Sequence, residues 1–451
     1  HNDVLAKLAD NREQLKRGEE ARTKLKDELA DIPRLEEQVK QFKETDVAKR
    51  LSDLQRLSRD ESVLVEGSQR TAEAVSAVES IADPELSAAL AADYVPPRGS
   101  WATRDAATAG FDPARLTAAV ELAKQETVAE PQDLHQVIVD HYSVREPGYR
   151  VLGPTGTRAG GSGMVVRGGY VVAQWGDVDR PEVAFSVAKS VLATVAGVAV
   201  SDGRISSIDE RVARDVAGPW FTGEHNGAIT WRHLLEQSSD WRGTLWDVPD
   251  WADRPTGANL REWQNPPLAT PGTAHEYNDV RVNLLALALL EVLREPLPVV
   301  MRERVMDPIG ASATWRWHGY ENSWVGIDGL RVQSVSGGGH FGGGMFISTA
   351  DLARFGLLLE RDGRWGAQQV VRPDWVRAMT APSKPRPDYG LLWWLNTDRK
   401  AIPAAPASAF WAAGFGGNYV YVDPEHDLVI VLRWVPEFEQ VIPAFLGALR
   451  N

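Results

Sequence analysis

The chain has 451 residues, of which 43% are hydrophobic and 25% are charged, a composition typical of a globular protein. Its formal net charge of -13 argues against a nucleic-acid partner, because phosphate binding requires clustered lysine and arginine. The chain contains no cysteine, which excludes disulfides, thiolate metal sites and a cysteine nucleophile. No apolar run approaches the ~20 residues that a membrane-spanning helix needs.

The chain begins at His1 rather than at methionine, and no signal-peptide pattern is visible. We therefore expect an upstream piece, such as a signal peptide, an anchor or a tag, to have been removed or left out. Together with the absence of cysteine, this slightly favours a periplasmic or secreted protein over a cytoplasmic one.

Composition changes near residue 95, since all 17 tryptophans lie at or beyond Trp101, whereas seven of the eleven lysines lie in the first 50 residues. Residues 1–93 have an amphipathic helical pattern, in which Pro33 should break or kink a helix. Two interpretations remain open: helices that pack on the main domain or form a stalk, and a coiled coil that binds a partner or another copy. Residues 94–100, rich in proline and glycine, are predicted to be a linker.

Residues 101–451 are predicted to form a single domain. Its expected elements are a helix capped by Asp112, a hairpin of residues 164–167 and 170–175 around a Gly-Gly turn, a buried helix at 187–200, a second hairpin of residues 419–422 and 428–434, and a closing helix at 441–450. Strands near both ends and a helix-rich middle predict an α+β fold, with one antiparallel sheet flanked by helices and a helical subdomain at about 204–335.

The sequence Phe185-Ser186-Val-Ala-Lys189-Ser190 carries the strongest chemical signal. Serine and lysine three positions apart lie on the same face of a helix, so the lysine amine can reach the serine hydroxyl. A serine hydroxyl is a weak nucleophile until a base takes its proton. Lysine can act as that base when burial lowers its pKa, and the apolar helix offers such a setting. Ser186 is the candidate nucleophile and Lys189 the candidate base.

A bare Ser-x-x-Lys pattern is weak evidence, because a chain of this length would contain about one by chance. Here the pattern occurs once, and Lys189 is one of only four lysines after residue 100. The alternative is a structural lysine that extends from the first turn of the helix to solvent.

The residues around this motif resemble the serine β-lactamase and penicillin-binding-protein superfamily. The resemblance is closest to its class C-like branch, which includes esterases, D-amino-acid peptidases and 6-aminohexanoate-dimer hydrolases. It covers roughly residues 100–450 and none of the N-terminal segment. The segments that carry it are residues 163–205, Ile229-Thr-Trp-Arg-His-Leu-Leu235, Pro271-Gly-Thr-Ala-His-Glu-Tyr-Asn-Asp279, residues 342–351 and Gly414-Phe-Gly-Gly-Asn418. The resemblance implies a β-lactamase/transpeptidase-like fold.

The second motif of that family is Tyr-x-Asn, and this chain has Tyr277-Asn278-Asp279. The resemblance implies that Tyr277 shares the Ser186 proton and later protonates the leaving group. Asp279 replaces the usual asparagine, is a candidate substrate contact, and would hold Lys189 charged. The division of labour between Lys189 and Tyr277 therefore stays open.

The third motif is Lys-Thr-Gly or His-x-Gly on an edge strand, and this chain has Ala412-Ala413-Gly414. No cation remains at this position to bind the carboxylate that β-lactams and D-Ala-D-Ala peptides carry. The resemblance still implies an oxyanion hole formed by the backbone N–H groups of Ser186 and Phe415. Gly414 and Gly416 would let the substrate approach the backbone closely.

His340, inside the glycine-rich residues 336–344, is a weaker candidate for a substrate contact on a flexible loop. The glycines there also match Gly-x-Gly-x-x-Gly, but no strand–turn–helix pattern surrounds them, and no Walker motif is present, so no cofactor is expected. No His-Glu-x-x-His or other close histidine pair predicts a metal site. The Trp-rich residues 240–254 could wall a substrate pocket or pack over the core.

The sequence therefore predicts a serine hydrolase that cleaves an ester or amide of a small molecule or short peptide through an acyl-enzyme on Ser186. One alternative is a β-lactamase or D-amino-acid peptidase. Another is a non-catalytic scaffold with a degenerate hydrolase domain, which Asp279 and Ala412 keep open.

Overall fold

The computed structural model describes residues 94–450, except residues 130 and 147. The chain divides into two units, His1–Ala89 and Leu90–Asn451, and all described residues belong to the second. The helical segment predicted for residues 1–93 lies outside the described residues. Within the described part, no helix is both long and apolar enough to cross a membrane.

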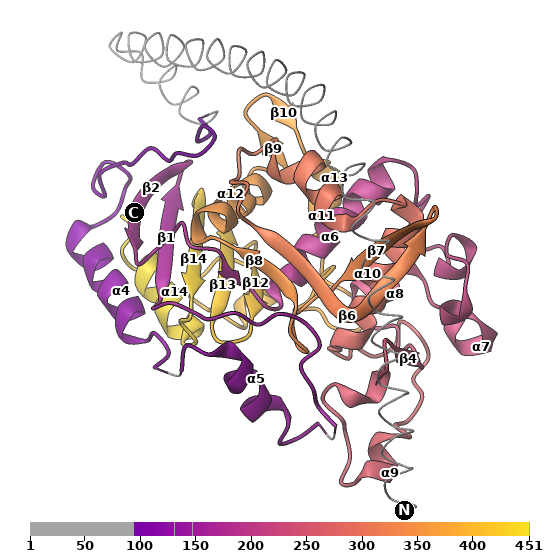
Figure 1. Ribbon diagram of the computed structural model, residues 1–451. Coiled ribbons are helices and arrows are strands. Elements are labelled where there is room, and N and C mark those ends of the chain that lie inside the picture. Colours follow the sequence, from indigo (N-terminus) through magenta and orange to yellow (C-terminus); the bar gives the residue numbers. More distant parts are fainter. Residues whose placement is uncertain (1–93, 130, 147, 451) are drawn as a thin grey trace, which may run out of the picture. The chain divides into compact units, whose positions relative to one another are not determined.

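One antiparallel sheet joins strands from the beginning and the end of this unit (Figure 1). Its strand order is β11-β12-β13-β14-β1-β2, with bounds β1 Ser162–Arg167, β2 Tyr170–Trp175, β11 Trp394–Leu395, β12 Phe410–Gly414, β13 Asn418–Asp423 and β14 Leu428–Arg433. Both predicted hairpins are confirmed. Gly168 and Gly169 turn the first with φ of 57° and 86°, a conformation that favours glycine.

Helices cover both faces of the sheet, as the α+β prediction requires. Helices α6 (Val187–Ser201) and α12 (Thr349–Glu360) share one apolar core with Val429 and Val431 of β14. Helices α4 (Pro113–Gln125) and α14 (Phe438–Leu446) share a second core with Ile430 and Leu432. Successive residues of a strand point to opposite faces, so β14 is apolar throughout because it is buried on both sides.

Three predicted helices are present. The Asp112 side chain caps α4 by accepting a hydrogen bond from the Arg115 N–H at 3.0 Å. The predicted buried helix is α6, which is buried continuously from Val187 to Ala199. The closing helix α14 begins at Phe438, earlier than predicted, because Phe438 packs into the second core.

A helical region follows α6. Its elements are η1 Val212–Arg214, η2 Pro219–Phe221, α7 Gly223–Asn226, α8 Trp231–Leu235, β4 Thr244–Leu245, β5 Val248–Pro249, η3 Asp250–Ala252, α9 Leu260–Trp263, α10 Asp279–Leu293, α11 Leu297–Met301 and η4 Arg302–Met306. The central helix α10 is buried along nearly its whole length and contacts α6 and α8.

The last part of the predicted helical subdomain, residues 316–335, is a long hairpin instead. Strands β6 (Arg316–Ile327) and β7 (Leu330–Val335) turn at Asp328-Gly329, with φ of 51° and 81°. Positive φ at both turn residues matches the twist of a two-residue hairpin. With β3 (Glu182–Val183) and β8 (Gly344–Ile347) the hairpin forms a second sheet, ordered β3-β8-β6-β7.

The remaining described elements are α5 Leu134–Tyr142, β9 Arg364–Trp365, β10 Gln368–Gln369, α13 Pro373–Met379 and η5 Thr397–Arg399. The predicted linker at 94–100 lies against α12, because the buried Arg354 guanidinium donates to the carbonyl oxygens of Pro96, Pro97 and Ser100 at 2.6–3.0 Å.

Candidate active site

Ser186 stands directly before the first turn of α6, where the two sheets meet. Its side chain makes no capping hydrogen bond to the helix, so the hydroxyl is left for other contacts. Phe185, the preceding residue, has φ of 48°, a left-handed conformation that is uncommon for an aromatic residue. Its ring packs against Phe415, with 5.2 Å between ring centroids. Tertiary packing therefore holds the turn that presents Ser186.

Lys189 connects Ser186 to Asp279. Its Nζ lies 2.8 Å from Ser186 Oγ and 2.8 Å from Asp279 Oδ1. The side chains of Lys189 and Asp279 are 2% and 1% exposed, so this ion pair is hidden from water. Helices α6 and α10, which are far apart in the sequence, bring the three residues together.

The pair is charged in this arrangement. Burial alone would lower the pKa of Lys189, but the Asp279 carboxylate overrides it and raises the pKa above its ordinary value. Burial would likewise raise the pKa of Asp279, whereas Lys189, His340 and Arg254 together hold it well below its usual range. Lys189 is therefore an ammonium that donates a hydrogen bond to Ser186 Oγ, and it is not poised to accept the serine proton.

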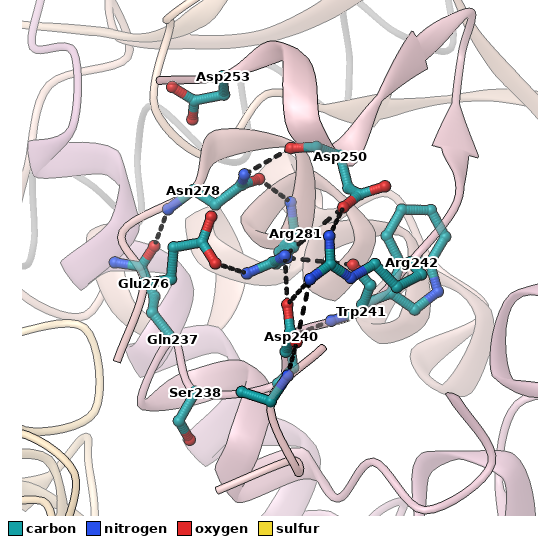
Figure 2. A network of polar contacts seen from close by, with 12 residues as sticks. Gln237, Ser238, Asp240, Trp241, Arg242, Asp250, Asp253, Glu276, Asn278 and Arg281 are labelled. Atoms are coloured by element: carbon teal, nitrogen blue, oxygen red, sulfur yellow. Dashed lines mark hydrogen bonds and ion pairs between the residues drawn. The ribbon is translucent and has the colours of Figure 1, made fainter. Parts of the chain in front are cut away.

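A polar network fixes the start of α10 and with it Asp279 (Figure 2). The Asn278 side chain caps α10 by accepting from the Arg281 N–H at 3.0 Å and donates to the Asp250 carbonyl at 2.7 Å. Arg281 lies between Asp240 and Glu276 in Figure 2, with ion-pair distances of 2.8 and 2.9 Å. Buried charges are tolerated when paired in this way, and this network anchors the backbone that carries Asp279.

Tyr277 presents its ring, rather than its hydroxyl, to the lysine. Lys189 Nζ lies 4.7 Å from the ring centroid, and Arg254 Cζ lies 5.1 Å from it. The ring also stacks on Trp394, with 6.1 Å between centroids. Among the described residues, the hydroxyl makes no hydrogen bond with Ser186 or Lys189. Its predicted role in proton transfer stays a prediction.

The strand with the third motif passes directly beside Ser186. A Cβ added to Gly414 would lie 3.2 Å from the Ser186 backbone nitrogen, and it would collide with the Ala184 carbonyl oxygen. Position 412 is a fully buried alanine, and its methyl side chain supplies no cation. Gly416, with φ of 77°, lies against the Trp434 ring. Gly414 and Gly416 thus permit close backbone approaches, whereas substrate contact and the oxyanion hole with Phe415 remain predictions.

Two buried side chains hold the turn that follows this strand. Asn418 donates from Nδ2 to the Phe415 carbonyl at 2.6 Å and accepts from Arg433 Nε at 2.6 Å. Arg433 also donates to the carbonyl oxygens of Ile347 and Val183. These hydrogen bonds connect the Phe415 turn to the second sheet, and they fix the Phe415 backbone relative to Ser186.

The glycine-rich residues 336–344 are buried rather than a flexible loop. Asn283 of α10 accepts from the Gly337 N–H at 2.8 Å, and the Ser336 hydroxyl accepts from the Gly339 N–H at 3.0 Å. Gly338 consequently lies against the ion pair, where an added Cβ would overlap Lys189 Nζ and Asp279 Oδ2. Only glycine fits at position 338, because any larger side chain would overlap one of the two charged groups.

We expect Gly338→Ala to lower kcat by about a hundredfold, since its methyl group would displace Lys189 or Asp279 by roughly 1 Å. The measurement is kcat with an activated ester. Gly326→Ala is the matched control, because a Cβ there meets nothing within 4 Å. Equal activity in both variants would contradict the tight packing described for Gly338.

His340 lies beneath the surface, in a cluster with two carboxylates. It is 2% exposed, and its Nε2 lies 2.7 Å from Glu146 Oε2 and 3.6 Å from Asp253 Oδ1. Asp253 Oδ2 in turn accepts from the Asp279 N–H. In this conformation His340 supports the residues behind Asp279 instead of lining an open surface, and its substrate contact stays a prediction.

The His340 cluster predicts a pH dependence of stability. Burial alone would lower the pKa of His340, but Asp253 and Glu146 raise it above its ordinary value. A raised folded-state pKa contributes stability that is fully present below about pH 6.5 and lost as the pH rises through the folded value. We expect a lower urea midpoint at about pH 9 than at about pH 6, and a smaller difference in His340→Gln. An unchanged difference in that variant would refute the assignment.

Among the described residues, this cluster is the one place where three histidine or carboxylate side chains lie close enough together to hold a metal ion. Ligand atoms of Glu146, Asp253 and His340 lie within 4.8 Å of one another, and all three residues are buried. Arg254 Nη1 already lies 2.5 Å from Asp253 Oδ1, and its positive charge opposes a cation there. Arg254 already pairs with a carboxylate of this cluster, so the donor set fits a metal poorly.

The structure adds four residues that the motifs did not single out: Glu146, Asp253, Arg254 and Gly338. Asp253 and Arg254 belong to the Trp-rich residues 240–254, and Gly338 belongs to the glycine-rich residues 336–344. The composition of these segments marks them in the sequence but does not predict the contacts of the three residues. Glu146 precedes the family motifs and carries no sequence signal of its own. The predicted residues Ser186, Lys189, Tyr277, Asp279 and Gly414 do lie together.

Several solved structures resemble this chain at low sequence identity. The hydrolase EstCE1, described as having promiscuous acyltransferase activity, is 15% identical with a TM-score of 0.50, over 75% of this chain and 99% of its own. A penicillin-binding-protein homologue from Caulobacter crescentus is 16% identical with a TM-score of 0.49, over 75% of this chain and 98% of its own. A beta-lactamase from Mycobacterium bovis is 21% identical with a TM-score of 0.47, over 67% of this chain and 97% of its own.

A family model gives the assignment directly. The model described as Beta-lactamase matches residues 144–434, which is more than half of the 451-residue chain. The matched span contains Ser186, Lys189, Tyr277, Asp279 and Gly414. The chain belongs to the beta-lactamase family.

Proposed function

We propose that this protein is a serine hydrolase that cleaves esters or small amides through an acyl-enzyme on Ser186. Family membership supports a serine hydrolase in general terms. The observation that carries the finer proposal is the position of Lys189 Nζ, 2.8 Å from both Ser186 Oγ and Asp279 Oδ1. A buried ammonium on the nucleophilic oxygen stabilises the negative charge that develops there during attack.

The charged state of Lys189 assigns the proton transfer to Tyr277. In the proposed acylation, Ser186 Oγ attacks the carbonyl carbon while its proton passes to a Tyr277 phenoxide. Lys189 Nζ and Arg254 Cζ both lie over the Tyr277 ring, so this side chain lies beside the two cations of the site. Tyr277 then gives the proton to the leaving oxygen or nitrogen, and water later hydrolyses the acyl-enzyme. The N–H groups of Ser186 and Phe415 would hold the oxyanion.

The third motif favours ordinary esters and amides over antibiotics or D-amino-acid peptides. Ala412 and Ala413 supply no cation on the strand beside Ser186, where those substrates would place a carboxylate. A β-lactamase or D-amino-acid peptidase is therefore the second candidate. A non-catalytic scaffold is the third, favoured by the ion pair that keeps Lys189 from acting as a base.

The proposal is tested by incubating the full chain with p-nitrophenyl acetate, butyrate and octanoate, and with a chromogenic cephalosporin. We expect turnover of at least one ester and a lower kcat/KM for the cephalosporin. Turnover of the cephalosporin alone would favour the β-lactamase alternative. Complete inactivity toward all four compounds would overturn the hydrolase proposal.

A further inference from the structure

An open cleft of about 610 Å³ adjoins the proposed site. It is lined by Asp140, His141, Tyr142, Val144, Arg145, Glu146, Arg254 and Pro255. The ring of Phe415, whose N–H is assigned to the oxyanion hole, contacts Tyr142 with 5.6 Å between centroids. Tyr142, which lines the cleft, thus packs against the residue that follows Gly414 on the strand beside Ser186.

Arg254 belongs both to this cleft and to the ion-pair chain behind Ser186. Its Nη1 lies 2.5 Å from Asp253 Oδ1 and 3.6 Å from Asp279 Oδ1, which is the oxygen that Lys189 contacts. Its side chain is 41% exposed, although the two carboxylates it contacts are at most 1% exposed. Arg254 thus has an inner edge bound to carboxylates and an outer edge in the cleft.

The outer edge of this guanidinium has no protein partner. Among the described residues, neither Nε nor Nη2 of Arg254 donates a hydrogen bond. A guanidinium carries five N–H donors in a planar fork that matches a carboxylate. The Arg254 backbone has φ of 53°, an uncommon conformation that the surroundings must maintain. The Glu146 carboxylate accepts from the Arg254 N–H at 3.3 Å and helps to hold it.

The buried carboxylates neutralise the Arg254 guanidinium only in part. Asp279 is paired with Lys189 at 2.8 Å, and Glu146 with His340 at 2.7 Å. Arg254 contacts Asp253 and, at 3.6 Å, Asp279, and both contacts involve the same terminal nitrogen, Nη1. A carboxylate in the cleft could therefore accept hydrogen bonds from Nε and Nη2 of Arg254.

We propose that Arg254 binds a carboxylate carried by the substrate, so that the preferred esters or amides are anionic. This inference rests on the proposed function and narrows its substrate class. Arg254 would supply a cation near Ser186, which the strand at Ala412 does not. A charge-assisted pair of this kind contributes roughly 1.5–3 kcal/mol, or about tenfold to a hundredfold in kcat/KM.

Two matched pairs of esters test the inference on the full chain. The first pair is p-nitrophenyl hexanoate and the mono-p-nitrophenyl ester of adipic acid, which differ by a carboxylate at the end of the acyl chain. The second pair is phenyl acetate and 3-acetoxybenzoate, which differ by a carboxylate on the alcohol. The readout is the kcat/KM ratio of anionic to neutral ester, in the wild type and in Arg254→Gln, Arg254→Lys and Arg145→Gln.

We expect the wild type to favour the anionic member of at least one pair by about tenfold or more. Arg254→Gln should bring that ratio close to one, Arg254→Lys should keep part of it, and Arg145→Gln should keep most of it. The ratio cancels any general loss of activity. Two results would overturn the inference but not the hydrolase proposal. One is hydrolysis of the esters with no preference for the anionic member of either pair. The other is a loss of preference in Arg145→Gln as large as that in Arg254→Gln. No hydrolysis of any ester would overturn both.

Discussion

Ser186→Ala should lower kcat/KM for activated esters by ~10⁴- to 10⁶-fold, the largest effect expected in this protein. The hydroxyl is the proposed nucleophile, and alanine leaves nothing that can form the acyl-enzyme. The fold should be unaffected, since the Ser186 side chain does not cap α6 and its hydroxyl contacts only Lys189 among the described residues. Steady-state kinetics and a urea unfolding curve measure the two effects separately.

Ser201→Ala is the matched control for this variant. Ser201 is the last residue of the same helix and is exposed, so its loss should change neither the rate nor the stability measurably. A Ser186→Ala protein that kept a tenth or more of the wild-type rate would show that another group performs the attack.

Lys189→Met should be the second most damaging change, and it should affect both rate and stability. The rate should fall by roughly a thousandfold, because the ammonium no longer stabilises charge on Ser186 Oγ. The free energy of unfolding should drop by about 3–5 kcal/mol, because Asp279 loses its principal partner while it stays buried. Chemical denaturation near neutral pH measures this loss, because the wild-type reference has Asp279 ionised and paired with Lys189 there.

The double variant Lys189→Met/Asp279→Leu separates the two effects. Replacing both buried charges with apolar side chains removes the unpaired carboxylate, so most of the lost stability should return. Activity should not return, because the ammonium is still missing. Recovery of activity together with stability would mean that Lys189 acts only by supporting the fold.

Local patterns in the sequence predict much of the sheet and of α6. The Gly168-Gly169 turn depends on neighbouring residues alone, and so does the apolar run of α6. The hairpin at 316–335 carries the same kind of signal in Asp328-Gly329, although it falls inside the predicted helical subdomain at about 204–335.

The environment of Lys189 could not be predicted in the same way. The motif places Lys189 near Ser186, because both belong to one helical turn. Asp253, Arg254 and Gly338 reach it from separate segments through the packing of α10, and no local spacing encodes that contact. Asp279 did indicate that Lys189 would be held charged, and the distance of 2.8 Å agrees with this.

The most direct measurement is covalent labelling of the full chain with a fluorophosphonate, followed by peptide mapping by mass spectrometry. Such a probe reacts with a serine only when the site activates its hydroxyl. The account predicts one label, on the peptide that contains Ser186, and its loss in Ser186→Ala with retention in Ser201→Ala. A wild-type protein that takes up no label, or that carries it on another residue, would contradict the assignment of Ser186 as the nucleophile.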